Sequence, residues 1–288
     1  MFHELKQSIC SRPLTVLASL GVVYAAYKVN KFFTPPSIKP KPKIHKTDYK
    51  KDTVYLYQFR RLENCPNMSP FCMKIEIICR VYNIEYEVIE NAKLRSRNGT
   101  LPFIELNGEH ISDSDLIEIR LRQHFKIPSL PAEQEAHATA ITRMADNHLF
   151  HILMRYHCAD NIFYQTFLEL LDFNSFIIPL AIPFFKQIIG GQIYKNSTSA
   201  IGDFEPEELN ELLHRDLRVV QTILGNKKFL FGNDQITPAD AAVFSQLAAV
   251  YYPFHTHITN VLEREFPLIL EYCERIRKQV YPTDFTVC

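Results

Sequence analysis

The residue types that could carry chemistry gather in two short stretches of the chain. Ser69 stands directly before Pro70, and Cys72 lies three residues further on. The second stretch opens with Leu101-Pro102 and ends with Asp113-Ser114. Ser before Pro is typical of a helix start, where a thiol has its pKa lowered and a hydroxyl can donate to a thiolate. The pattern indicates chemistry at sulfur, with Ser69 and Cys72 as candidate catalytic residues.

Simpler roles stand beside each of these candidates. Ser69 could be only a helix cap, Cys72 a small core residue, and Asp113-Ser114 a second cap. Cys72 matches only the second cysteine of a CxxC pair, because Ser69 holds the first position. A CxxC disulfide cycle is therefore excluded, and monothiol chemistry or a Cys65–Cys72 pair stays open.

The cysteines and histidines do not predict a metal site. The seven cysteines include no CxxC pair and show no zinc-type spacing. Cys72 and Cys79 would lie roughly 10 Å apart on one helix, which is too far for one ion. His148 and His151 have no carboxylate at matching spacing. We expect no metal ligands, and we interpret the cysteines as reduced cytosolic thiols.

Composition predicts a packed globular protein. Hydrophobic residues make up 47% of the 288 residues and charged residues 22%, which is unlike a disordered chain. The formal net charge is +0, so there is no basic excess to attract nucleic acid. We therefore expect no nucleic-acid partner.

The elements that must position Ser69 alternate between strand and helix. The expected order is strand, helix, strand, irregular connector, hairpin and helix, over residues 54–59, 69–82, 84–88, 91–100, 103–111 and 117–125. Asn107-Gly108 predicts a type I′ turn in the hairpin. This order indicates a parallel first pair of strands and an antiparallel last pair.

The remaining residues predict helices. They cover residues 133–158, 163–185, 206–224 and 258–280, with one more starting at the capping box Thr237-Pro238-Ala239-Asp240. The stretch over residues 163–185 is very apolar, but Glu169, Asp172 and two prolines interrupt it. We expect it to be a buried core helix rather than a membrane segment.

The amino-terminal residues predict a membrane anchor. Leu14 to Tyr27 form an uncharged, mainly apolar run, and lysines are far more numerous after it than before it. By the positive-inside rule the folded part faces the cytoplasm. A cleaved signal peptide is the alternative. We assign residues 1–33 to the anchor and residues 34–52 to a Pro- and Lys-rich linker.

Three motifs together resemble the glutathione transferases. They are Leu101-Pro102, Asp113-Ser114 and the helix start at residues 231–244, and they cover most of residues 53–280. Residues 62–79 are similar to the failed axon connections and metaxin-like branch, with the nematode cadmium-responsive proteins most similar. The resemblance implies an α/β thioredoxin-like domain over residues 53–127 and an all-α helical domain over residues 128–288. It also implies a cis bond at Leu101-Pro102.

The resemblance implies a function as well. Glutathione is the expected co-substrate, with Leu101 and Pro102 beside its cysteinyl unit and Asp113 and Ser114 at its γ-glutamyl end. Ser69 would then donate to the glutathione thiolate. The second ligand would be an apolar electrophile or glutathione-bound metal, in a role in cadmium or other stress handling.

Other roles stay open on the same resemblance. They are a non-catalytic adaptor of the metaxin-like type, which the missing first cysteine favours, and a monothiol reductase that uses Cys72. An organelle membrane is the expected location, with the endolysosomal system as one option. A homodimer is expected only by analogy.

Overall fold

The computed structural model describes residues 42–254 and 256–286, which belong to one compact unit. The predicted anchor at residues 1–33 and the first part of the predicted linker lie outside the described residues. Among the helices that the structure describes, none is long and apolar enough to cross a membrane.

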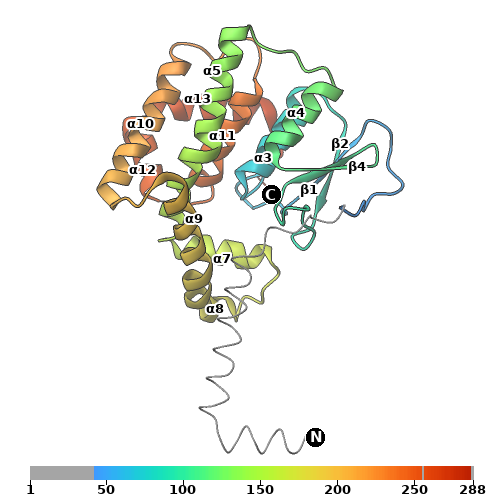
Figure 1. Ribbon diagram of the computed structural model, residues 1–288. Coiled ribbons are helices and arrows are strands. Elements are labelled where there is room, and N and C mark those ends of the chain that lie inside the picture. The colour runs from blue at the N-terminus through green and yellow to red at the C-terminus, as the bar shows by residue number, and fades with distance from the viewer. Residues whose placement is uncertain (1–41, 255, 287–288) are drawn as a thin grey trace, which may run out of the picture. The chain divides into compact units, whose positions relative to one another are not determined.

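The first domain is built on a four-stranded sheet with the order β2-β1-β3-β4 (Figure 1). The strands are β1 (Val54–Gln58), β2 (Tyr86–Glu90), β3 (Phe103–Leu106) and β4 (Glu109–Ser112). β1 and β2 are parallel, whereas β3 is antiparallel to both β1 and β4. Asn107 and Gly108 both have positive φ, as a type I′ turn requires. The predicted thioredoxin-like arrangement is confirmed.

Two helices cover one face of this sheet. They are α3 (Pro70–Val81) and α4 (Ser114–His124). Val54 and Leu56 of β1 pack with Ile75 of α3 and Leu121 of α4 in one buried cluster. Residues 91–100 contain no regular element, as predicted. The starts of α3 and α4 carry Ser69 and Asp113, so this layer of helices fixes the candidate site.

The other face of the sheet is covered by the chain that precedes β1. The carboxylate of Glu105, 1% exposed, accepts the backbone N–H groups of His45 and Lys46, both at 2.8 Å. Its Oε2 also accepts the Tyr57 hydroxyl at 3.0 Å. The sequence predicts an extended linker over residues 34–52. The structure instead attaches the described part of this stretch to the sheet from His45 onward.

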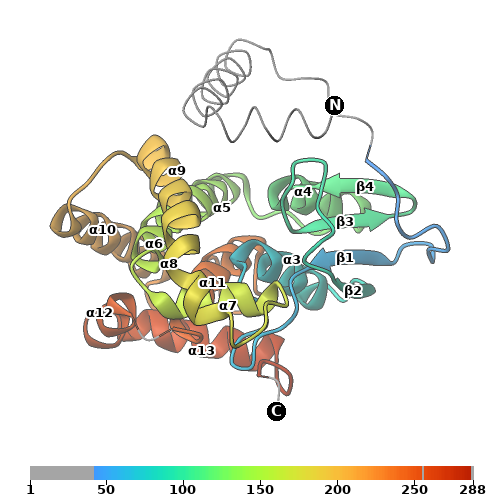
Figure 2. The same cartoon turned by 90° about the horizontal axis from the view of Figure 1, so that it is seen from below.

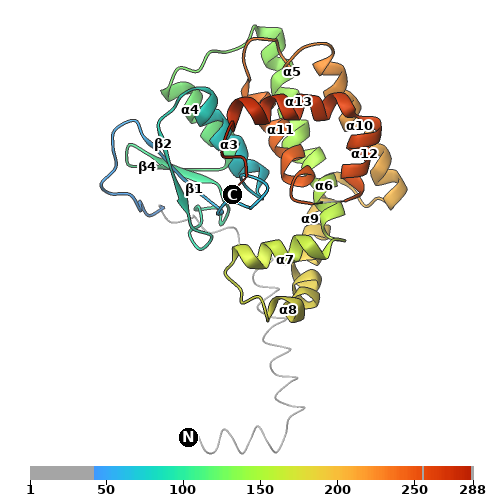
Figure 3. The ribbon, with the colours of Figure 1, turned by 180° about the vertical axis from the view of Figure 1, so that it is seen from behind.

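The second domain contains helices throughout its described residues (Figures 1 and 3). They are α5 (Ala132–Arg143), π-helix η1 (Met144–Leu149), α6 (Phe150–His157), α7 (Asn161–Leu170), α8 (Ile178–Phe185), π-helix η2 (Lys186–Gly190), α9 (Gly191–Ile201), α10 (Pro206–Leu224), α11 (Pro238–Tyr251), α12 (His257–Glu265) and α13 (Pro267–Val280). The capping box at Thr237 is confirmed, and Asp240 Oδ2 accepts the Thr237 N–H at 2.8 Å.

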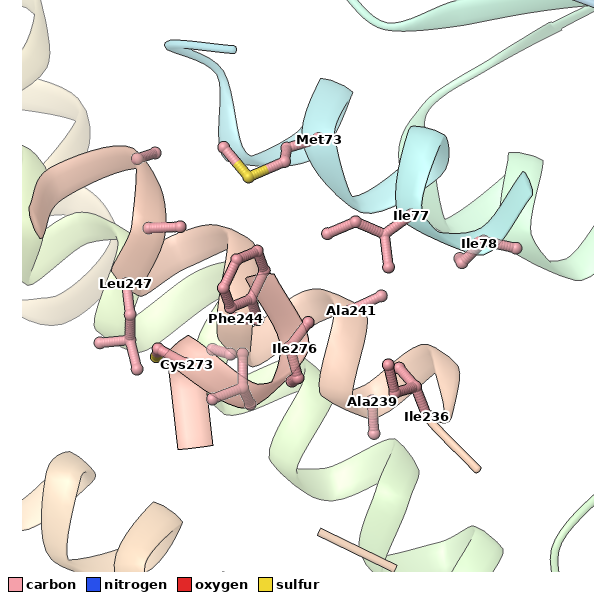
Figure 4. Packing of buried hydrophobic residues seen from close by; sticks show 14 of the residues in the cluster. Met73, Ile77, Ile78, Ile236, Ala239, Ala241, Phe244, Leu247, Cys273 and Ile276 are labelled. Atoms are coloured by element: carbon pink, nitrogen blue, oxygen red, sulfur yellow. The ribbon is translucent and has the colours of Figure 1, made fainter. Parts of the chain in front are cut away.

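The two domains share one hydrophobic core. Helix α11 is buried from Pro238 to Val250 and packs directly against α3. Figure 4 shows Met73 and Ile77 of α3 opposite Ala241 and Phe244 of α11. Because α3 also carries Ser69 at its start, the helical domain helps to position that residue.

The apolar stretch at residues 163–185 is not the buried helix that the sequence predicted. It forms α7 and α8, separated by a loop in which Asp172 has a φ of 61°. Pro179 lies in the first turn of α8, where proline is tolerated and a new helix can begin. Helix α7 buries one side, with Phe163, Tyr164, Leu168 and Leu170. In the segment that follows, Phe176 and Leu180 are 88% and 81% exposed.

Candidate functional site

Ser69 is the N-cap of α3. Its Oγ accepts the backbone N–H of Cys72 at 3.4 Å, and its own N–H donates to Asn67 Oδ1 at 2.9 Å. Asn67 is fully buried, and its Nδ2 donates to the Phe59 carbonyl at 2.9 Å. The cap uses a lone pair of the Ser69 hydroxyl, and its proton is directed to a second acceptor.

Sequence reasoning missed Asn67, although a signal for it exists. An Asn two residues before a backbone N–H often forms an Asx-turn, and Asn67 stands in that position before Ser69. Because Asn67 also holds the end of β1, it fixes the distance between the sheet and the start of α3.

The Leu101-Pro102 bond is cis, as predicted. The Leu101 side chain packs with Cys72 and Phe103 in one buried cluster, which places this bond beside the start of α3. Among the described residues, the N–H and C=O of Leu101 form no hydrogen bond. This backbone can therefore pair with an extended ligand.

Asp113 and Ser114 begin α4. Asp113 is the N-cap, exposed and at a φ of 80°, and its Oδ1 accepts the Asp115 N–H at 3.1 Å. A positive φ is uncommon for a residue with a side chain, and such strain often marks functional sites. Ser114 is buried.

The ladder between β3 and β4 brings these residues together. Phe103 pairs with Ser112, so the ends that carry Pro102 and Asp113 lie side by side. The start of α3 joins them through the cluster of Cys72 and Leu101. Five predicted residues, Ser69, Leu101, Pro102, Asp113 and Ser114, thus lie near the end of the sheet where β3 begins and β4 ends.

Cys72 does not have the environment that the sequence predicted. Its side chain is fully buried, and burial raises the pKa of its thiol to about 12. Hydrogen bonds from Ser69 and from the Phe59 backbone lower the pKa but do not offset burial. The expected lowering by the helix dipole is therefore wrong. Cys65 and Cys72 are both free, so the structure shows no disulfide between them.

Three other polar side chains of the first domain that could meet a ligand are engaged with protein groups. Arg61 forms an ion pair with Glu76 at 2.5 Å, and Arg60 donates to the Glu169 carbonyl at 2.5 Å. The Tyr57 hydroxyl donates to Glu105, which leaves it no proton for a thiolate. Burial raises the pKa of Tyr57 above its usual range.

A cavity of about 520 Å³ lies between the loop after β1 and helix α7. Its lining includes Arg60, Arg61, Glu63, Gln165 and Glu169. Charged and polar groups dominate, so this cavity fits a polar molecule better than the apolar electrophile we expected. In the described part of the chain, no group of three or more His, Cys, Asp or Glu could hold a metal ion.

Comparison with known proteins agrees with this architecture. The model of the glutathione S-transferase N-terminal domain matches residues 70–163, and that of the C-terminal domain matches residues 213–276. Among solved structures, the beta-etherase LigF from Sphingobium sp. strain SYK-6 has a TM-score of 0.52 at 15% identity, covering 78% of this chain and 94% of that chain.

Two curated relatives narrow the family. The isoprene-epoxide–glutathione S-transferase of Rhodococcus sp. strain AD45 is 24% identical over 239 residues, 78% of this chain and 98% of that protein. Failed axon connections of Drosophila melanogaster is 31% identical over 283 residues, 92% of this chain. The chain spans 66% of the length of the fly protein. The chain therefore belongs to the glutathione transferase-like superfamily, in the branch of Failed axon connections.

Proposed function

We propose that this protein binds glutathione at the end of the sheet where Leu101, Asp113 and Ser69 lie. The observation that carries the proposal is the free backbone of Leu101 beside the exposed Asp113 carboxylate. An extended peptide can hydrogen-bond to that backbone as an added strand would. The Asp113 carboxylate would accept from the γ-glutamyl ammonium group, and the helix start at Ser114 would meet the carboxylate next to it.

The chemistry that fits this site is transfer of a glutathione sulfur. The thiol loses its proton to solvent, and the Ser69 hydroxyl donates a hydrogen bond to the thiolate. The sulfur then forms a bond to an electrophilic carbon, and the leaving group departs with the electron pair. Cys72 takes no part, because its buried thiol is protonated at neutral pH.

Calorimetry of the full chain with millimolar glutathione tests the binding proposal. Asp113→Asn keeps the N-cap and tolerates positive φ but removes the charge. We expect it to weaken binding about 10-fold or more, as loss of a charge-assisted hydrogen bond does. Asp48→Asn changes another exposed aspartate and should bind normally. Equal affinity of both variants would place the ligand elsewhere.

A non-catalytic adaptor is the second candidate function. It is favoured by the burial of Cys72 and by the charged lining of the cavity beside α7. An absence of heat when the wild-type chain meets glutathione would support it. Titration with a glutathione–cadmium complex in the same experiment tests the proposed link to cadmium. Binding of the complex but not of glutathione alone would identify the metal thiolate as ligand.

A further inference from the structure

The loop before α8, α8 itself and the following η2 present large apolar side chains to solvent. We call this set the α8 face: Phe173, Phe176, Ile177, Leu180, Phe184 and Ile188. Phe176 and Leu180 are 88% and 81% exposed, and Phe184 is 61% exposed. Figures 1, 2 and 3 show α8 beside α7 and α9, at an outer end of the helical domain. Folding alone does not account for this exposure.

The opposite side of the same segment is also apolar. Ile182, Phe185 and Ile189 pack against the buried cluster of Phe163, Tyr164 and Phe254. An ordinary surface helix turns charged residues outward, whereas this one has apolar residues on both sides. No charged residue occurs from Phe173 to Phe185. The α8 face therefore needs an apolar environment of its own.

Lys186, the first charged residue after Phe185, is engaged with protein groups. The Lys186 Nζ donates to the Ala159 carbonyl at 3.1 Å and to Asn161 Oδ1 at 3.2 Å. No charge of this segment would have to be desolvated if the α8 face left water. Specific protein interfaces carry a hydrogen bond for about every 100–200 Å². The six side chains of the α8 face offer no such group, which favours lipid over a protein partner.

The length of the apolar segment also favours lipid as the environment of the α8 face. Apolar stretches of about 10–14 residues belong to core helices, to interfacial segments or to signal peptides. The exposure of Phe176 and Leu180 excludes the core, and a position in mid-chain excludes a signal peptide. An interfacial helix, which lies in the plane of a bilayer, is the remaining class.

Only a short stretch of chain joins the predicted anchor to the folded part. The predicted anchor ends at residue 33, and the chain is fastened to the sheet at His45. Twelve residues span at most about 40 Å when fully extended. We propose that the α8 face inserts into the interfacial layer of the anchor's bilayer as a second membrane contact. The proposal does not depend on glutathione.

A single tryptophan tests this insertion, because the chain contains none. Leu180→Trp places the reporter on the α8 face, and Leu268→Trp places the control on α13, where Leu268 is 48% exposed. Both full-length variants are mixed with vesicles of phosphatidylcholine and phosphatidylserine, with or without brominated acyl chains. We expect a blue shift and strong quenching by the brominated lipid for Leu180→Trp only.

The control separates insertion from mere tethering, since both variants carry the same amino-terminal segment. Equal quenching at the two positions, or none at residue 180, would overturn the proposal. A blue shift before vesicles are added would also overturn it. If that shift grows with protein concentration, the occupant is a second copy; if not, it is another segment of this chain. Phe184→Trp repeats the test should Leu180→Trp fail to fold.

Discussion

Replacing Lys74 by methionine tests how the two domains are held together. Lys74 lies on α3, is fully buried, and contacts three carboxylates. Its Nζ is 3.0 Å from Asp115 Oδ1, 3.1 Å from Glu118 Oε2 and 2.8 Å from Asp146 Oδ2. Asp115 and Glu118 belong to α4 of the first domain, whereas Asp146 belongs to η1 of the second. The ammonium group thus joins the two domains.

The loss of stability in Lys74→Met depends on which other partners each of the three carboxylates retains. Without Lys74, Asp115 retains Arg143 and Glu118 retains Arg122. Asp146, 7% exposed, retains among the described side chains only the amide of Gln246, at 3.1 Å. Removing one partner of a buried ion pair costs about 3–5 kcal/mol, so we expect Lys74→Met to lower the free energy of unfolding by that amount. Adding Asp146→Asn should restore about half or more of the loss.

The pH dependence provides an independent check. Burial raises the pKa of Asp146 despite the opposing effect of Lys74. An acid with a raised pKa in the folded state contributes stability at low pH that is lost as pH rises through that pKa. Without Lys74 the pKa of Asp146 rises further, so the defect of Lys74→Met should be larger at neutral pH than at about pH 5.

Urea unfolding at both pH values measures these differences. Lys93→Met, which removes an exposed lysine, serves as the control and should leave the free energy of unfolding nearly unchanged. A loss below about 1 kcal/mol for Lys74→Met, or a loss independent of pH, would refute the reasoning.

Three further outcomes are expected. Ser69→Asp keeps the helix cap but lacks a proton to donate, so the rate of glutathione conjugation to an aryl halide should fall about 100-fold. Ser69→Thr keeps the hydroxyl and should stay active. Equal rates for the two variants would exclude a role of the hydroxyl in conjugation. Iodoacetamide should label Cys72 in the urea-unfolded chain but not in the folded chain, because the thiol is buried and has a pKa of about 12. Mass spectrometry of the digested peptides measures the labelling. Rapid labelling of Cys72 in the folded chain would contradict its burial. Gly108→Ala should lower the free energy of unfolding, measured by thermal denaturation, by about 1–2 kcal/mol, because φ is 78° and the added Cβ would lie 3.1 Å from the Tyr49 ring. Gly191 has open space around the added Cβ, so Gly191→Ala should not lower it.

Local sequence signals predicted the arrangement of the first domain well. Alternation in residues 84–88, the Asn107-Gly108 turn and the Ser69-Pro70 helix start each act over a few neighbouring residues. Their outcomes in the structure therefore depend little on distant contacts. The resemblance to glutathione transferases supplied the cis bond at Leu101, which the residues alone would not have indicated.

Properties that depend on distant partners could not be predicted in this way. The pKa of Cys72 is set by burial under Leu94, Leu101 and Phe59, which come from three separate segments. The exposure of Phe176 depends on where α7 and α9 place α8. A hydrophobic run shows that a segment avoids water, but it does not show whether protein or another apolar environment will cover it.

The buried carboxylate of Glu105 determines where a usable fragment of this protein can start. A fragment beginning at residue 53 would look complete by strand content, yet it would delete both N–H groups that Glu105 accepts. Each unmet hydrogen bond of a buried carboxylate costs about 1–3 kcal/mol or more. The stacked rings of Tyr57 and Phe103 would also lose His45, which lies against both. Recombinant fragments should therefore begin no later than residue 44.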